Sequence, residues 1–305
     1  MKLEGIHHVT AITEDGQRNA DFYAGVLGLR MVKKTVNQDD PSVYHLFYAD
    51  EVGSPGADIT FFEFPGVPQG RAGDGMIHTI VWRVATTDSL DFWAERLRHH
   101  GTESEREDDL LRFDDPEGLA HELLVADVPD QPLVADHPEV PGELALQGFH
   151  AVRAYTGRPD STRALIEEHL GFVPLGDAWE VRGLRRGGLY YLDVPPPERG
   201  LQGAGTVHHV AWASEDEDHQ AWRDRVQSAG ANPTQIIDRF WFRSIYFREP
   251  SGVLFEIATL GPGFAADEPL DHLGEGLVLP PDFEHLRGQI ESSLKPIRNP
   301  RLLTA

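Results

Sequence analysis

Two short segments, far apart in the chain, each carry a pair of neighbouring histidines inside an apolar run. They are GIHHVTAIT, residues 5–13, and GTVHHVAWAS, residues 205–214. Imidazole nitrogens bind transition metals and transfer protons near neutral pH. Because neighbouring side chains on a strand point to opposite faces, only one histidine of each pair can face a given site. Each pair is therefore expected to give one imidazole to a site on one face of its strand.

The composition restricts both the ligands and the partners. The chain contains no cysteine, so any metal must bind through nitrogen and oxygen atoms. A net charge of −23 disfavours binding to nucleic acid, because little positive charge is present to neutralise phosphates. No run approaches the roughly 18 apolar residues of a membrane span, and the first residues show no signal-peptide pattern. We therefore expect a cytoplasmic protein that binds neither nucleic acid nor a membrane.

The histidine pairs belong to a segment that recurs four times. The four openings are IHHVTAI, IHTIVWR, FHAVRAY and VHHVAWA, which begin at Ile6, Ile77, Phe149 and Val207. After each opening comes an amphipathic segment that ends near a glycine, as a helix does when a left-handed residue closes it. Short apolar runs that are typical of strands follow. This pattern predicts an α+β fold made of four βαβββ modules.

Four ranges contain the modules, and a linker divides them into two pairs. The modules are expected at 1–66, 75–127, 147–195 and 204–260. Residues 128–146 are rich in proline and acidic side chains, which indicates a linker between an N-terminal pair, 1–127, and a C-terminal pair, 147–260. Residues 261–305 form a proline-rich, acidic tail that is expected to be partly helical.

Aligning the four openings separates the histidines into two columns. The first column contains His7, His78, His150 and His208, and the second contains His8, Thr79, Ala151 and His209. If the second column faces the cavity, only the first and fourth units supply imidazoles, and the fourth unit closes with Glu256. Two histidines and one carboxylate are the ligand set of non-haem Fe(II) oxygenases. The alignment therefore predicts one metal per chain, bound by His8, His209 and Glu256.

Other ligand sets remain open on the residues alone. His150, His209 and Glu256 would draw on the adjacent third and fourth units, although the register disfavours His150. A second site from His78 and Glu122 is a weaker alternative, and Glu122 is expected to have a structural partner instead.

Longer segments resemble a known family. FYAGVLGLRMVKKTVNQDDPSVYHLFYADEVGSPGADITFFEFPG, GMIHTIVWRV, DRFWFRSIYFREPSGVLFEIAT and GFAADEPL are similar to the hydroquinone-type ring-cleaving dioxygenases of the vicinal oxygen chelate superfamily. The resemblance spans essentially the whole chain. In that superfamily two βαβββ modules form an open barrel around a metal, so the resemblance implies two open-barrel, glyoxalase-like units.

The resemblance also implies an activity and the residues that perform it. It implies an Fe(II)-dependent enzyme, with Mn(II) as an alternative metal, that opens a hydroquinone or substituted hydroquinone with O2. It implies the same metal ligands as the alignment. The catalytic residues that it implies are His7, His208, Arg239 and Tyr246, with Thr10 nearby. Arg239 would hold an anionic oxygen, Tyr246 would donate a hydrogen bond, and His208 would act as an acid or base. The expected partners are a small aromatic diol, O2 and further copies of the chain, since related folds commonly dimerise.

Three other functions remain open. A catechol-type extradiol dioxygenase would use His150 in place of His8. A glyoxalase-type isomerase would use Zn(II) or Ni(II) and a second glutamate, for which Glu63 in ITFFEF is the candidate. A ligand-sequestering protein of the same fold would need no metal ligands.

Overall fold

Each of the four repeated units folds into a strand, a helical segment and three further strands. The computed structural model describes residues 1–303. The first unit contains β1 (Leu3–Thr13), α1 (Gly16–Ala20), the π-helical segment η1 (Asp21–Val26), β2 (Arg30–Asn37), β3 (Asp40–Ala49) and β4 (Asp58–Glu63). The second contains β5 (Met76–Val84), α2 (Thr87–His99), β6 (Ser104–Arg106), β7 (Leu110–Asp114) and β8 (Ala120–Val125). The third contains β9 (Phe149–Tyr155), α3 (Pro159–Glu168), β10 (Val173–Leu175), β11 (Ala178–Arg182) and β12 (Gly187–Asp193). The fourth contains β13 (Val207–Ser214), the 3-10 turn η2 (Asp216–Asp218), α4 (His219–Ser228), β14 (Ile237–Asp238), β15 (Arg243–Arg248) and β16 (Leu254–Thr259).

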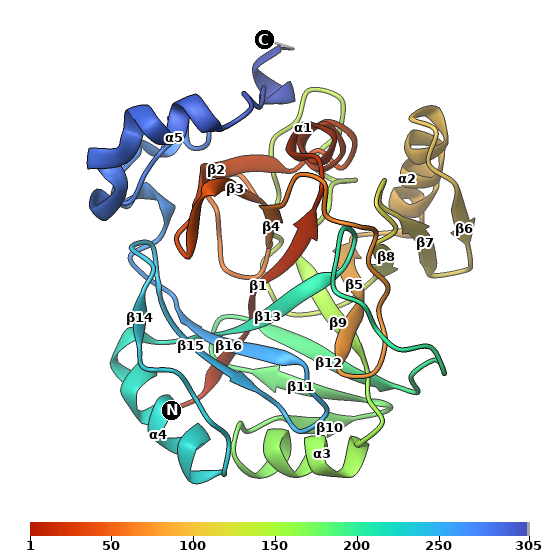
Figure 1. Ribbon diagram of the computed structural model, residues 1–305. Helices are drawn as coiled ribbons and strands as arrows, with labels where there is room; N and C mark the ends of the chain where they lie inside the picture. Colours follow the sequence, from red (N-terminus) through yellow and green to blue (C-terminus); the bar gives the residue numbers. More distant parts are fainter. Residues whose placement is uncertain (304–305) are drawn as a thin grey trace.

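Two eight-stranded sheets pair the first unit with the fourth and the second with the third (Figure 1). One sheet has the order β14-β15-β16-β13-β1-β4-β3-β2, and the other has the order β10-β11-β12-β9-β5-β8-β7-β6. The α+β fold of four modules is therefore confirmed. The sheets group the units differently from the two halves of the sequence, because β1 pairs antiparallel with β13 and β5 pairs with β9. This pairing brings the two histidine pairs onto neighbouring strands.

The helices follow the predicted pattern of apolar residues. In α2 the side chains of Leu90, Trp93 and Leu97 are fully buried, while Thr86 caps the first turn by accepting a hydrogen bond from the Ser89 amide. The glycines expected to close the four helical segments all have positive φ: Gly28, Gly101, Gly171 and Gly230. No helix within residues 1–303 is both long enough and apolar enough to cross a membrane.

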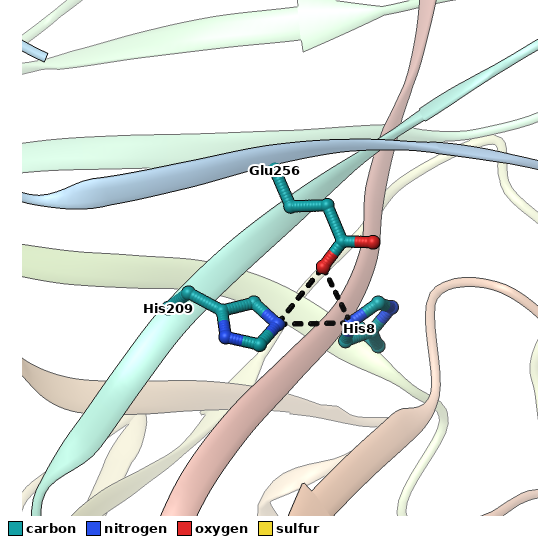
Figure 2. A group of neighbouring side chains, drawn as sticks. All are labelled: His8, His209 and Glu256. Atoms are coloured by element: carbon teal, nitrogen blue, oxygen red, sulfur yellow. Dashed lines mark hydrogen bonds and ion pairs between the residues drawn. The ribbon is translucent and has the colours of Figure 1, made fainter. Parts of the chain in front are cut away.

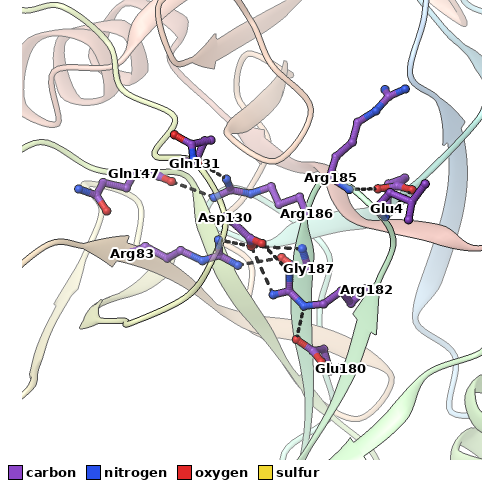
Figure 3. Close-up of polar contacts among 11 residues, drawn as sticks. Glu4, Arg83, Asp130, Gln131, Gln147, Glu180, Arg182, Arg185, Arg186 and Gly187 are labelled. Carbon is purple, nitrogen blue, oxygen red and sulfur yellow. Dashed lines mark hydrogen bonds and ion pairs between the residues drawn. The ribbon is translucent and has the colours of Figure 1, made fainter.

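Arginines of the second and third units hold the linker in place (Figure 3). Asp130 of the linker forms ion pairs with Arg83 of β5 and Arg182 of β11. Arg186 donates hydrogen bonds to the carbonyls of Gln131 and Gln147. Although burial raises the pKa of Asp130, hydrogen bonds from Arg182 and Arg83 outweigh it and lower the pKa to about 2. The carboxylate is thus ionised and fixes the start of the linker to both units.

The C-terminal tail packs against the first unit next to the site. It contains the 3-10 turns η3 (Phe264–Ala266), η4 (Leu270–His272), η5 (Pro281–Leu286) and η6 (Pro300–Leu303) and the helix α5 (Arg287–Ser293). The fully buried ammonium of Lys33 donates to the Phe264 carbonyl at 3.1 Å and to Asp267 at 2.8 Å, and it also contacts Glu268. Asp267 in turn accepts from the indole of Trp241, which lines the site. The tail therefore supports one wall of the site.

Candidate active site

His8, His209 and Glu256 meet in the first sheet (Figure 2). They come from β1, β13 and β16, which are adjacent strands. Glu256 Oε2 lies 3.2 Å from His8 Nε2 and 2.9 Å from His209 Nε2, and the two Nε2 atoms lie 3.3 Å apart. The three side chains are 0 to 4% exposed. All three residues that the alignment predicted as ligands therefore lie together in the protein interior.

The three atoms are spaced as ligands on one face of a metal ion. Two atoms that bind an ion at about 2.1 Å and at right angles to each other stand about 3 Å apart, close to all three separations. Both carboxylate oxygens of Glu256 are buried, and within residues 1–303 neither accepts a well-aligned hydrogen bond. Burial raises the pKa of Glu256, but His8 and His209 outweigh it and hold the pKa well below its usual range. A buried, ionised carboxylate that faces two imidazole nitrogens fits a divalent cation.

A β-bulge lies at the first histidine of each pair. On β1, Ile6 pairs with Trp212 and His8 with Ala211, which leaves His7 as the extra residue. On β13, His208 is the extra residue, because Thr10 pairs with His209 and Ala11 with Val207. A bulge places two neighbouring side chains opposite a single partner and redirects one of them. Both imidazoles of a pair can therefore lie together, which regular strand alternation would prevent.

The first histidine of each pair holds the ring of the second. His7 Nε2 donates to the Thr259 carbonyl at 3.1 Å, so His7 Nδ1 must accept the 2.9 Å hydrogen bond from His8 Nδ1. His8 Nε2 is thereby left without a proton and free to bind a metal. The equivalent Nδ1 contact between His208 and His209 is 2.8 Å.

The pKa values of the two outer histidines favour the same orienting role. Burial lowers the pKa of His7 to about 3 and that of His208 to about 3. Both rings are therefore neutral at pH 7. An imidazole can accept a hydrogen bond at Nδ1 only when it is neutral. The acid or base role expected for His208 stays a prediction, whereas the geometry supports a role in fixing the His209 ring.

We expect His7→Phe to weaken metal binding about 10- to 100-fold, because it removes the acceptor that sets the His8 tautomer. Titration of the metal against a competing chelator measures the affinity. His7→Gln keeps an acceptor and should recover part of the loss. An unchanged affinity in His7→Phe would show that the contact with His8 does not influence the ligand.

A cavity adjoins His8 and His209, two of the three predicted ligands. Its lining residues are His8, Asn37, Gln38, Asp39, His45, Phe47, Phe62, His209, Arg239, Trp241, Phe242 and Tyr246. The cavity volume is about 30 Å³. An apolar cavity of about 150 Å³ holds benzene, whereas about 10–15 Å³ holds one water molecule. Entry of an aromatic ring therefore requires side chains of the lining to move.

Arg239 and Tyr246 lie together on the unit-four side of this cavity. Tyr246 pairs with Glu256 across β15 and β16, and the guanidinium of Arg239 lies 5.5 Å from the Tyr246 ring centre. Burial and the nearby Glu256 raise the pKa of Tyr246, so its hydroxyl keeps its proton and can donate a hydrogen bond. Arg239 also forms an ion pair with Asp39 of unit one, at 3.0 and 3.2 Å, and its carbonyl accepts from Gln38. These contacts join the two units beside the cavity.

Backbone strain accompanies this arrangement. Phe240, between Arg239 and Trp241, is the one non-glycine residue with positive φ in the described chain, at 73°. A bulky side chain in this conformation is strained, and such strain concentrates at functional sites. Trp241 and Phe242 line the cavity, whereas Phe247 packs in the main core.

The residues of the alternative sets lie elsewhere. His150 is on β9 of the other sheet, again at a bulge, and its buried Nδ1 has no hydrogen-bond partner in the described part of the chain. Glu122 has the expected structural partner, since it pairs with Arg112 at 3.0 Å. Glu63 accepts a hydrogen bond from the Gly16 amide at the start of α1. His78 contacts Thr79, just as His7 contacts His8 in the first unit. His78 also pairs with Asp193. The second sheet therefore repeats the bulges without the ligands.

Sequence patterns alone do not predict the unit-one wall of the cavity, which consists of Asn37, Gln38, Asp39, His45, Phe47 and Phe62. One signal was present. His45 is a single polar residue within the apolar run YHLFYA of β3, which indicates a polar function on that strand.

Comparisons with known proteins point to one family. A model of the Glyoxalase/Bleomycin resistance protein/Dioxygenase superfamily matches residues 5–123 and 148–257. MhqA and MhqO of Bacillus subtilis, both provisionally named ring-cleaving dioxygenases, are 40% and 42% identical to this chain. MhqA covers 98% of this chain and is itself covered completely, and the MhqO match covers 97% of each. A chlorohydroquinone/hydroquinone 1,2-dioxygenase of Sphingobium indicum is 32% identical over 95% of each chain.

Solved structures give the same fold. The crystal structure of a provisionally named dioxygenase from Bacillus subtilis matches with a TM-score of 0.91 and 41% identity, over 98% of both chains. Glyoxalase I from Zea mays matches with a TM-score of 0.59 and 15% identity, over 88% of this chain and 96% of its own. At that identity the second likeness shows a shared fold alone.

Proposed function

This chain belongs to the Glyoxalase/Bleomycin resistance protein/Dioxygenase superfamily, and we propose that it is an Fe(II)-dependent ring-cleaving dioxygenase that opens a hydroquinone with O2. The observation that carries the proposal is the buried set of His8, His209 and Glu256, drawn from the first and fourth units. Relatives over nearly the whole chain are named as ring-cleaving dioxygenases, and one is named for hydroquinone. Two imidazoles and one carboxylate suit Fe(II), and the same set accepts Mn(II).

The metal and the chain have separate tasks in the proposed reaction. A bound Fe(II) would supply open coordination positions and the redox chemistry that O2 requires. His8, His209 and Glu256 would hold it, and His7 and His208 would keep the two ligand rings in the binding tautomer. Arg239 would hold an anionic oxygen of the substrate, and Tyr246 would donate a hydrogen bond from its protonated hydroxyl. The aromatic walls of the cavity would exclude water from the ring.

The polar groups of the cavity favour a para-diol. A catechol presents two adjacent oxygens to a metal, whereas the second oxygen of a hydroquinone lies across the ring. The protein must then fix the ring through its own contacts, since misplacement by about 1 Å can lower the rate about 100-fold. Arg239, Tyr246 and His45 provide polar contacts in addition to the three predicted ligands. The isomerase alternative is less well supported, because Glu63 bonds to the start of α1 and does not belong to the group formed by His8, His209 and Glu256.

Oxygen consumption tests the proposal. The protein is loaded anaerobically with Fe(II) and assayed in an oxygen electrode with hydroquinone, chloro- and methyl-hydroquinones, and catechol. We expect oxygen uptake that depends on iron and on a hydroquinone. A far higher rate with catechol would overturn the hydroquinone assignment. Conversion of a hemithioacetal with Zn(II) or Ni(II), and no oxygen uptake with iron, would instead support the isomerase.

A further inference from the structure

His45 is a polar group of the cavity with no role in holding the proposed metal. It lies on β3 of the first unit, whereas the three predicted ligands lie on β1, β13 and β16. Its ring is flanked by Phe47, at 4.0 Å between ring centres, and by Phe62, at 4.4 Å. Both phenylalanines also line the cavity. The imidazole is therefore held in an aromatic wall.

Two buried hydroxyls fix the orientation of this ring. His45 Nε2 lies 2.8 Å from Thr60 Oγ1, which lies 2.8 Å from Thr10 Oγ1. Both threonines are 0% exposed, so no water competes for these hydrogen bonds. The other ring nitrogen, Nδ1, makes no hydrogen bond within residues 1–303, and the residue as a whole is partly exposed. One hydrogen-bonding position of His45 is therefore available to a molecule in the cavity.

His45 lines the same cavity as the predicted ligands His8 and His209, but it lies on a different strand. The ring of Phe62 neighbours both sides, with its centre 4.4 Å from that of His45 and 6.5 Å from that of His209. A molecule in this cavity can therefore contact the predicted metal site with one end and His45 with another. A hydroquinone carries its two oxygens at opposite ends of its ring. Burial also lowers the pKa of His45 well below its usual range, so the neutral ring can meet a hydroxyl as donor or as acceptor.

Resting on the proposed function, we infer that His45 Nδ1 binds the distal hydroxyl of a para-diol whose first oxygen lies at the metal. The Thr60–Thr10 pair positions the imidazole for this contact. A ring that lacks a para hydroxyl leaves Nδ1 without a partner in an aromatic wall, which costs affinity. His45 would therefore select hydroquinones over monophenols and catechols.

Anaerobic binding to the Fe(II)-loaded protein tests this inference without requiring turnover. Dissociation constants for hydroquinone and 4-methylphenol are measured by quenching of tryptophan fluorescence. The native protein should bind hydroquinone about 10-fold more tightly, the effect of one hydrogen bond. In His45→Phe, which fits the neighbouring aromatics, the two constants should become about equal. Thr60→Val, which removes only the group that orients His45, should lower the preference in part.

A matched control and the metal content separate the possible outcomes. Phe62→Leu changes the wall without changing the hydrogen bonds and should weaken both ligands alike. Iron content and melting temperature identify a variant that has lost its fold. If His45→Phe is such a variant, the binding preference of Thr60→Val decides the test. A native preference for hydroquinone that persists in His45→Phe and Thr60→Val would overturn the inference. Loss of that preference in a protein that takes up no oxygen would support the contact and refute the dioxygenase activity.

Discussion

Replacing His8 by alanine is expected to abolish metal binding and, with it, turnover. The change removes one of three ligand atoms that lie within 3.3 Å of one another in a buried site. Two remaining protein ligands cannot complete the facial set that non-haem Fe(II) oxygenases use. Loss of an orienting residue alone costs about 10- to 100-fold in affinity, so loss of a ligand should cost more than that. Elemental analysis after Fe(II) loading and desalting measures the effect.

His150→Ala is the matched control for this variant. His150 occupies an equivalent bulge in the other sheet, and it was the rival ligand on the sequence alone. The His150→Ala variant should keep the native iron content and oxygen uptake. Full iron content and turnover in His8→Ala, combined with loss of iron in His150→Ala, would contradict the assignment of His8.

Arg239→Ala and Tyr246→Phe are each expected to lower turnover by about 100- to 1,000-fold while iron stays bound. Loss of one preorganised donor to a developing anion has an effect of this size. Neither side chain belongs to the predicted ligand set, and Tyr246→Phe removes a single hydroxyl. Turnover is followed as oxygen uptake with a saturating hydroquinone, and iron is measured in the same samples.

Tyr48→Phe provides the control for Tyr246→Phe. Tyr48 is fully buried, its hydroxyl has no hydrogen-bond partner within residues 1–303, and it does not line the cavity. Its loss should leave turnover unchanged. If Tyr246→Phe turned over hydroquinone at the native rate, the hydroxyl would have no part in the reaction. A loss of iron in parallel with activity would indicate a structural role for the residue.

The repeat pattern predicted the modules and placed the candidate ligands on equivalent strands. Alignment of the four openings separated His8 and His209 from the outer histidines, because strand alternation distinguishes neighbouring residues. It could not show that His7 and His208 turn back onto their neighbours, since that contact depends on bulges. A bulge depends on the partner strand, which single-strand periodicity does not describe.

Pairing between distant strands explains the other differences. The sequence divides the four units at the linker, but the sheets join the first unit to the fourth and the second to the third. The contribution of unit one to the cavity wall could be recognised only from that strand pairing. Asp39 and Arg239, for example, are far apart in the sequence and meet because β1 pairs with β13.

Isotope labelling of the product tests the central proposal most directly. The Fe(II)-loaded protein is given hydroquinone under 18O2, the carbonyl product is trapped by reduction before it exchanges with water, and the product is analysed by mass spectrometry. We predict one ring-opened product that contains both atoms of one O2 molecule. Hydroquinone that is recovered unchanged, or oxidised to the quinone without gaining oxygen, would contradict the proposed ring cleavage.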